Sequence, residues 1–237
     1  MDAAALKQRL VDAASMRYRA SGPFAYQFAR GKLKRDPVFV AILAMGLITG
    51  PARILDLGCG QGVLAAWLLA AEQACAAGQW CQDWPVAPSG WYFRGLELQR
   101  HEVERANLAL GNRARIELGD IRHACFAEAD AIVILDVLHY MNPDTQVALL
   151  TRVHAALAPG GRLLLRVGDA AGGLAFQISR WVDQTVLLVR GQGWVPLHCR
   201  PVADWVATLN RLGFRTAAIP MSANTPFANV LLVAQPQ

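Results

Sequence analysis

Along most of the chain, short apolar runs alternate with longer stretches in which apolar residues recur every three or four positions. The short runs predict seven strands, at 53–57, 91–97, 114–118, 131–136, 162–167, 214–220 and 229–234. The longer stretches predict helices at 61–75, 99–110, 122–128, 143–158, 172–190 and 201–212. Continuous apolar runs such as 131–135 are typical of strands covered on both faces, as in parallel sheets. Strand–helix alternation of this kind predicts a doubly wound α/β sheet.

The first 50 residues have a different pattern, which predicts three helices. The first covers 2–20 and ends at Ser21-Gly22-Pro23, and the second covers 23–31. Asp36-Pro37 offers an N-cap and a first helical position for a third helix that runs through residue 47. We therefore expect an N-terminal helical cap or lid at 1–50 and an α/β domain at 51–237. Within that domain we expect a loop insertion at about 76–90 and a substrate-side segment at about 171–200.

The composition, with 54% hydrophobic residues in 237, indicates a folded protein with a large core. The formal net charge is +5. Its distribution is uneven, because residues 1–35 hold eight basic and two acidic side chains while the remainder holds 15 basic and 16 acidic ones. The basic character therefore belongs to the N-terminal segment, which is either a solvated helical face or a face directed at a substrate.

Cysteine usage and apolar segments bear on location. The chain has five cysteines, an odd number, without C-x-x-C spacing, so neither a disulfide framework nor a zinc site is indicated. The uncharged segment 37–52 is too short for a membrane span and contains Gly and Pro. We expect a cytoplasmic protein without a transmembrane segment or a bound metal.

The strongest chemical signal is Asp56-Leu57-Gly58-Cys59-Gly60-Gln61-Gly62, which follows a predicted strand and opens a helix. Glycines at alternate positions let the backbone bend and approach a ligand closely. The helix that follows offers free N–H groups, and ligands of open α/β sheets bind at the carboxyl ends of the strands. The G-x-G-x-G spacing differs from the dinucleotide fingerprint, and the carboxylate of Asp56 suits a cationic ligand better than a pyrophosphate.

This segment resembles the first motif of class I S-adenosylmethionine-dependent methyltransferases, and further motifs follow in the family's order. Glu97 ends the second strand, Asp120 follows the third and Asp136 ends the fourth, while 157–163 resembles the turn before the fifth. The resemblance covers 52–168, and 227–232 resembles the last antiparallel strand. It implies a doubly wound, mostly parallel, seven-stranded Rossmann-like sheet, here with an N-terminal helical extension, and S-adenosylmethionine as cofactor.

The resemblance also implies roles for individual residues. The turn 58–62 would hold the methionine part, Asp56 would organise that turn near the ammonium group, and Glu97 would accept the ribose hydroxyls. Asp120 and the backbone of Ile121 would hold the adenine edge. The complete expected cofactor set is Asp56, Gly58, Cys59, Gly60, Gly62, Glu97, Leu98, Asp120, Ile121 and Asp136.

Methyl transfer from a sulfonium is a one-step displacement that depends on alignment of the reactants, and a base is needed when the nucleophile is a hydroxyl. Asp136, His139 and Tyr140 are the candidate catalytic residues at the end of the fourth strand, and His139 has a suitable ordinary pKa. The alternative is that His139 packs on the adenosine or caps the next helix. His198 is a second candidate base.

The acceptor is expected to be small and aromatic or phenolic, free or bound to a carrier. The candidate substrate residues are Tyr18, Tyr26, Trp181 and His198, because aromatic side chains suit an apolar acceptor. Segment 17–33 resembles methyltransferases encoded with bacterial aryl-polyene pigment pathways, which implies a role in secondary metabolism and a phenolic head group. If an acyl carrier protein holds the acceptor, the basic segment would steer this acidic partner.

Other acceptors fit less well. The turn Asp136-Val137-Leu138-His139 lacks the N/D-P-P-Y/F signature of exocyclic amine methylation in bases, and all three lysines precede residue 35. Three alternatives remain open: an RNA methyltransferase, a peripheral membrane lipid methyltransferase with an interfacial segment at 32–48, and a non-catalytic partner subunit that binds the cofactor. The oligomeric state does not follow from the sequence.

Overall fold

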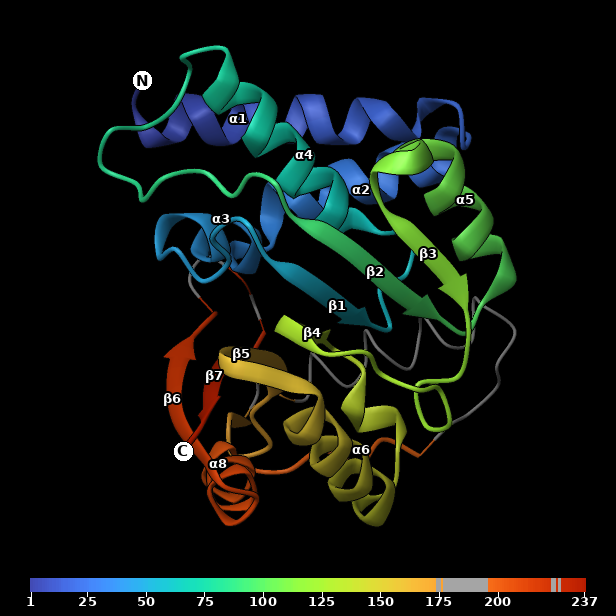
Figure 1. The fold of residues 1–237 in the computed structure, drawn as a ribbon, viewed down its shortest axis with the longest axis vertical. Helices are drawn as coiled ribbons and strands as arrows, with labels where there is room; N and C mark the ends of the chain where they lie inside the picture. The colour runs from blue at the N-terminus through green and yellow to red at the C-terminus, as the bar shows by residue number, and fades with distance from the viewer. Residues whose placement is uncertain (174–175, 177–195, 223–224, 226) are drawn as a thin grey trace. The chain divides into compact units, whose positions relative to one another are not determined.

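The structure is a computed structural model that describes the chain except for residues 174–175, 177–195, 223–224 and 226 (Figure 1). It divides into two compact units, Met1–Ala124 and Cys125–Gln237. Each unit has its own strands and covering helices. The expected division at residue 50 stays a prediction, but the N-terminal helices belong to the first of these units.

The N-terminal extension consists of α1 (Ala3–Met16), the 3-10 turn η1 (Arg17–Arg19), α2 (Pro23–Arg35) and α3 (Pro37–Ala44). Asp2 caps α1 by accepting from the backbone N–H of Ala5 at 2.8 Å. The α2 helix runs four residues beyond its predicted end, because the stop comes at Asp36, which precedes a proline and adopts an extended conformation. The same Asp36 caps α3 through Val38, as predicted.

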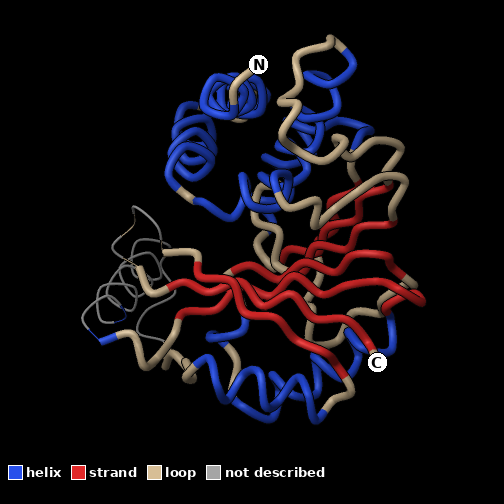
Figure 2. The backbone as a smooth tube through the Cα atoms, turned by 90° about the vertical axis from the view of Figure 1, so that its left-hand side faces the viewer, coloured by secondary structure: helices blue, strands red, loops and turns tan. Residues whose placement is uncertain are grey.

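The sheet of the first unit contains three parallel strands in the order β3-β2-β1. They are β1 (Arg53–Leu57), β2 (Tyr92–Glu97) and β3 (Arg115–Leu118). The crossovers are α4 (Val63–Ala76), then α5 (Arg100–Leu110) with the 3-10 turn η2 (Gly111–Arg113). Helix α4 is apolar on nearly all sides, and α1 packs along it (Figure 1). Figure 2 distinguishes the helices, in blue, from the strands, in red. Since the strands are parallel, Leu57, Glu97 and Leu118 all lie at the same edge.

The second unit has a mixed arrangement in the order β4-β5-β7-β6. Strands β4 (Ala129–Leu135) and β5 (Leu157–Gly168) are parallel, whereas β7 (Asn229–Pro236) is antiparallel to both β5 and β6 (Phe214–Pro220). The helical elements are η3 (Leu138–Tyr140), α6 (Pro143–Ala156) and α8 (Val202–Arg211).

The start of β5 differs from the prediction. The strand begins at Leu157, which pairs with Ala129, and the next aligned pair is Ala131 with Arg162. The turn expected before the strand, Pro159-Gly160-Gly161, therefore forms an irregularity inside the paired region rather than a connection ahead of it.

The described residues form seven strands, and helices connect β1 to β2, β2 to β3 and β4 to β5. This arrangement confirms the predicted mostly parallel α/β fold with an N-terminal helical extension. The short helix expected at 122–128 is wrong. Asp120 instead closes a turn, since its carboxylate accepts from the N–H of Arg122 and its carbonyl from that of Ala124. Most of the helix expected at 172–190 falls outside the described residues.

The insertion between α4 and β2 has its own aromatic contacts. The rings of Trp80 and Trp84 meet edge to face with centroids 5.8 Å apart, and Trp80 Nε1 donates to the Pro85 carbonyl at 2.9 Å. No helix in the described part of the chain has both the length and the apolar character needed to cross a bilayer.

Candidate cofactor site and active site

The glycine loop leaves β1 and turns over the end of β2. Its three glycines have positive φ angles, 80° at Gly58, 55° at Gly60 and 73° at Gly62, which other residues adopt at a cost. The N–H groups of Gly58 and Cys59 donate to the Leu96 carbonyl at 2.8 and 3.2 Å. The loop is thereby tied to β2, one residue before Glu97.

Two of these glycines have different surroundings. A Cβ built on Gly60 meets nothing within 4 Å, whereas a Cβ on Gly62 comes within 2.7 Å of Leu110 Cδ1 on α5. Gly60 therefore borders space that a ligand can occupy. Gly62 is needed for packing of the first turn of α4 against α5.

Glu97 is held at the centre of this loop with 8% of its surface exposed. Its Oε2 accepts from the N–H of Gly60 at 2.9 Å, and its Oε1 accepts from the N–H of Gln99 at 2.9 Å. A carboxylate oxygen can accept more than one hydrogen bond, so both keep capacity for hydroxyl donors. This arrangement fits a ribose.

Asp56 is buried below the loop. Its pKa rises to about 7, because burial disfavours the charged form and Glu97 repels it, while Lys32 of α2 acts in the opposite direction. Burial and the same two carboxylates also raise the pKa of the Cys59 thiol. The loop therefore has a strongly negative environment that a cationic ligand would stabilise.

Three residues expected to contact the cofactor, Leu98, Asp120 and Ile121, have different surroundings. Ile121 is buried, whereas Leu98 is 59% exposed directly after β2 and offers an apolar surface. Asp120 forms a bidentate pair with Arg122, whose Nε lies 2.9 and 2.8 Å from the two carboxylate oxygens, and this pairing lowers the pKa of Asp120. Together with the open space beside Gly60 and the buried carboxylates, these groups fit S-adenosylmethionine.

In the second unit, Asp136 directly follows β4, has a φ of 61° and is the only non-glycine residue with positive φ in the described chain. The Asp136 carboxylate pairs with the guanidinium of Arg166, whose Nε donates to Oδ1 at 2.7 Å. Arg166 lies on β5 and is 2% exposed. This pair between a buried guanidinium and a partly exposed carboxylate holds the strained turn after β4.

The two candidate histidines come together in this unit. The N–H of His198 donates to the carbonyl of His139 at 2.8 Å, although the two are far apart in sequence. The ring of His139 also contacts that of Tyr140, with centroids 4.1 Å apart. Burial lowers the pKa of His139, against the opposing effect of Asp136, so the imidazole is neutral near pH 7.

Gln146 of α6 organises this region and was not identified from the sequence. It is fully buried, and its Nε2 lies 2.9 to 3.0 Å from three backbone carbonyls, those of Leu138, Met141 and His198. Its Oε1 accepts from Arg200. A polar residue on the otherwise apolar face of α6 was the available signal.

The aromatic substrate candidates have separate environments. Tyr18 is fully buried, and its hydroxyl donates to the Gln61 carbonyl at 2.8 Å, within the glycine loop. Tyr26 is half-buried under the guanidinium of Arg19, 5.3 Å from the ring centroid. Trp181 lies outside the described residues. Nine of the ten expected cofactor residues belong to the first unit, while Asp136 and the candidate histidines belong to the second.

Comparison with known proteins identifies the family. The family described as "Methyltransferase domain" matches residues 26–215, most of the chain. The chain belongs to this family. A carboxy-S-adenosyl-L-methionine synthase of Chromohalobacter salexigens is 33% identical over 119 residues, 48% of this chain and 39% of the relative. A tetracenomycin polyketide synthesis 8-O-methyl transferase of Streptomyces glaucescens is 26% identical over 168 residues, 70% of this chain and 45% of the relative.

The methyltransferase fold is also similar to that of a magnesium protoporphyrin IX methyltransferase from Synechocystis PCC 6803, solved with bound S-adenosylhomocysteine. The TM-score is 0.60 at 19% identity, with 100% of both chains covered. The matches to the two curated relatives span less than half of their own lengths. The predicted family, its cofactor S-adenosylmethionine and the Rossmann-like fold are confirmed, and the roles of single residues stay predictions.

Proposed function

We propose that this methyltransferase transfers a methyl group from S-adenosylmethionine to a hydroxyl of a small aromatic or phenolic acceptor, free or bound to a carrier. The observation that carries the proposal is the neutral His139 at the end of β4, bonded through its backbone to the segment of His198. When bound, the cofactor supplies an electrophilic methyl group on a positively charged sulfur. A neutral imidazole can take the proton that a phenolic hydroxyl loses.

The residues around His139 support this role. Gln146 donates to the carbonyls of Leu138, the first residue of η3, and Met141, which directly follows η3, so the segment that carries the imidazole is held in place. Asp136 favours the protonated form of His139, which would stabilise the cation that forms when the proton arrives. Tyr140 offers an aromatic ring beside the same imidazole.

A hydroxyl acceptor agrees with the similarity to an 8-O-methyl transferase of polyketide synthesis. The extension exposes an aromatic surface, since Phe24 is 61% and Phe28 37% exposed and their rings stack with centroids 6.3 Å apart. Arg105 lies over the Phe24 ring, 5.0 Å from its centroid. Apolar rings beside cations suit an acidic carrier protein that presents an aromatic acceptor.

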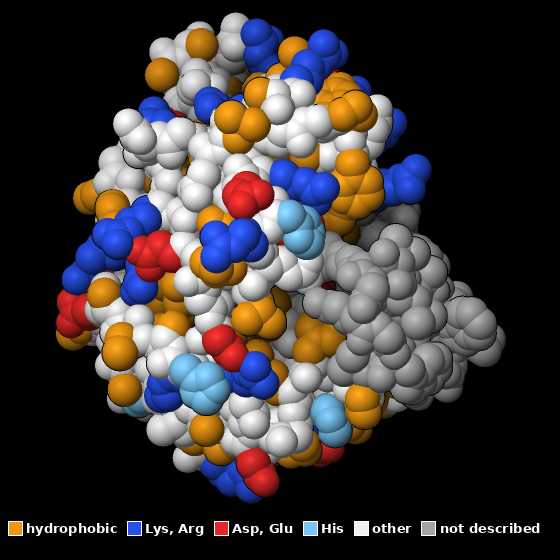
Figure 3. All heavy atoms as spheres, turned by 90° about the vertical axis from the view of Figure 1, so that its right-hand side faces the viewer, with side chains coloured by type: hydrophobic (Ala, Val, Ile, Leu, Met, Phe, Trp, Pro, Cys, Tyr) orange, Lys and Arg blue, Asp and Glu red, His pale blue; other side chains and the backbone are white. Residues whose placement is uncertain are grey.

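The face in Figure 3 bears on the nucleic-acid alternative. Among the described residues on this face, acidic and apolar side chains lie between the lysine and arginine side chains. Such mixing favours a small acceptor over a nucleic-acid backbone. The odd number of cysteines without a metal-binding spacing supports the proposed cytoplasmic location.

The test is methylation of a panel of phenols, free and linked to an acyl carrier protein, with methyl-labelled S-adenosylmethionine. We expect label on a hydroxyl oxygen, and a rate that rises with pH and levels off below the ordinary histidine pKa of 6.5. His139→Gln should lower kcat at least ~100-fold, the lower range for a general base, with little change in cofactor affinity. Binding of cofactor without transfer to any phenol, while RNA or lipid vesicles accept label, would contradict the proposal; no transfer at all would support the non-catalytic subunit.

A further inference from the structure

The N-terminal extension reaches into the glycine loop through two hydrogen bonds to one residue. The hydroxyl of Tyr18, on η1, donates to the backbone carbonyl of Gln61 at 2.8 Å. The side-chain amide of Gln61 donates to the carbonyl of Ala25, on α2, at 2.9 Å. Tyr18 and Gln61 are both almost completely buried, so these bonds are shielded from water.

Gln61 occupies the position in the loop where such bonds matter most. It stands between Gly60 and Gly62, both of which have positive φ angles, and the N–H of Gly60 binds Glu97. A rotation of the peptide that carries the Gln61 carbonyl would disturb the turn into α4. Because η1 binds the backbone and α2 binds the side chain, the loop conformation is held from two sides.

We propose that Tyr18 and Gln61 are positioning residues for the cofactor loop, which makes the N-terminal extension part of the S-adenosylmethionine site. Ordering of the extension and binding of the cofactor are then coupled. By linkage, a ligand that requires the loop conformation also stabilises the helices that hold it. This inference depends on the family cofactor and is independent of the acceptor.

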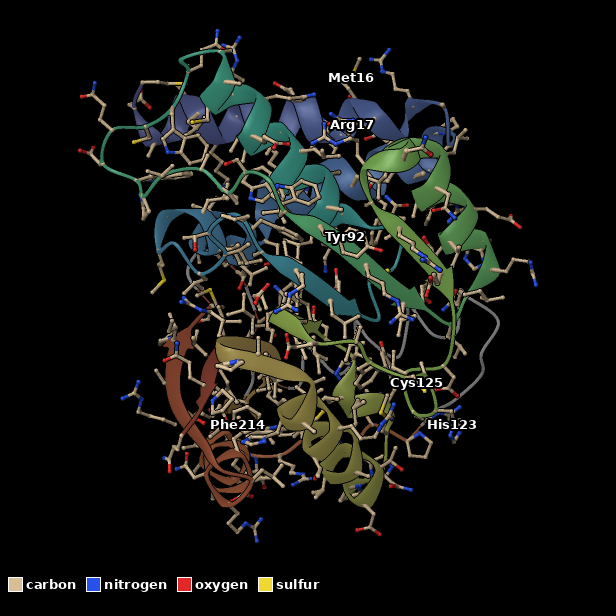
Figure 4. All side chains as sticks on the ribbon, viewed as in Figure 1. Met16, Arg17, Tyr92, His123, Cys125 and Phe214 are labelled. Atoms are coloured by element: carbon tan, nitrogen blue, oxygen red, sulfur yellow. The ribbon has the colours of Figure 1, made fainter. Side chains whose placement is uncertain are left out.

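A second hydrogen bond of the same segment serves as a control, because it attaches the extension to α5 without contacting the glycine loop. Ser21, which follows η1, donates its hydroxyl to the backbone carbonyl of Arg105 on α5 at 2.9 Å. Arg17, which marks η1 in Figure 4, lies one residue before Tyr18. Tyr18→Phe and Ser21→Ala each remove one hydroxyl-to-carbonyl bond from the same short segment, but only the first bond ends on the glycine loop.

The first measurement is the affinity for S-adenosylhomocysteine by calorimetry, which needs no acceptor. We expect Tyr18→Phe to raise the Kd ~10-fold, because the buried Gln61 carbonyl loses its hydrogen-bond donor. Ser21→Ala should change the Kd less than twofold. Gln61→Met, which removes the bond to Ala25 but keeps the backbone carbonyl, should weaken binding in the same direction. Equal effects of Tyr18→Phe and Ser21→Ala would overturn the proposal.

The second measurement is hydrogen exchange, which reports the coupling itself. In the wild type, S-adenosylhomocysteine should slow amide exchange in α1, η1 and α2 as well as in the loop. Ser21→Ala should keep this protection and Tyr18→Phe should lose it at equal ligand saturation. If Tyr18→Phe does not fold, Gln61→Met replaces it. Absence of protection in the wild-type extension, or protection unchanged in the variant, would refute the coupling.

Discussion

At the scale of single residues, two buried carboxylates set the electrostatics of the cofactor loop. Burial and the nearby charge of Glu97 raise the pKa of Asp56, and burial and both carboxylates raise the pKa of the Cys59 thiol. The positive charge of Lys32 acts in the opposite direction and favours the ionised form of Asp56. A ligand with positive charge relieves this repulsion, so the ligand-free loop stores unfavourable electrostatic energy that binding can release.

The raised pKa of Asp56 predicts a pH dependence of stability. The folded protein holds this proton up to about pH 7, whereas the unfolded chain loses it near the ordinary value of 3.8. The free energy of unfolding should therefore fall as pH rises between these values, by an amount of order 4 kcal/mol, and then stay constant with respect to this group. Urea unfolding of the ligand-free protein at pH 5 and 8 should show about 3 kcal/mol of this change, because the rest of the fall occurs below pH 5.

In the same experiment, Asp56→Asn should reduce the slope between pH 5 and 7, because the neutral amide has no proton to lose. Replacement of the exposed loop residue Asp83 by Asn serves as the control and should leave the slope as in the wild type. A slope that persists unchanged in Asp56→Asn would contradict the assignment.

Glu97 carries a second prediction at this scale. Glu97→Ala should weaken binding of S-adenosylhomocysteine ~10- to 100-fold, because it removes the charge-assisted bonds that we propose to the ribose hydroxyls and frees the N–H of Gly60. Glu117→Ala is the control, since that carboxylate pairs with Arg94 on the neighbouring strand. Calorimetry that shows equal affinity for Glu97→Ala and wild type would remove Glu97 from the site.

At the scale of elements, two glycines of the turn from β1 into α4 are expected to have different functions, Gly62 in packing and Gly60 in ligand binding. Gly62→Ala should destabilise the protein by ~1–3 kcal/mol, because the new methyl group meets Leu110 at 2.7 Å in a left-handed conformation. Gly60→Ala should retain more stability, since nothing lies within 4 Å, but should lose more cofactor affinity. Urea unfolding and calorimetry together distinguish the two variants, and the reverse ranking would argue against this division.

Element boundaries were predictable where a local signal sets them. Asp36 and Pro37 mark the start of α3, as their capping chemistry requires. The region after β3 was not predictable, because Asp120 uses its carboxylate and carbonyl to close a turn where the side-chain pattern indicated a helix. The end of α2 was also missed: the helix was predicted to cover 23–31, but the extended residue that ends it is Asp36.

At the scale of the whole molecule, the structure shows how part of the basic charge in residues 1–35 is used. Arg30 pairs with Asp12 between α1 and α2, Lys32 lies 3.7 Å from Asp36, and Arg19 covers the Tyr26 ring. Arg9, Lys34 and Arg35 are exposed on the same helices. The positive potential that remains can act on an approaching acidic partner.

This charge predicts salt-dependent binding of an acyl carrier protein. Affinity should fall about tenfold or more between 50 and 300 mM salt, because screening shortens the range of the attraction. The double variant Arg19→Gln/Arg35→Gln should also weaken binding. The control Arg215→Gln removes one positive charge from β6, outside the N-terminal segment, and should have little effect. Binding by surface plasmon resonance that is insensitive to salt and to the first pair would contradict the carrier proposal.

The sequence by itself determined the α/β fold, the family and the cofactor, because these depend on local periodicity and on contiguous motifs such as Asp56–Gly62. Only the tertiary structure decided which distant residues cooperate. The bond from Tyr18 to Gln61, the pair of Asp136 with Arg166 and the contacts of Gln146 join residues separated by long stretches of chain. The raised pKa of Asp56 likewise arises from burial, which no pattern of neighbouring residues specifies.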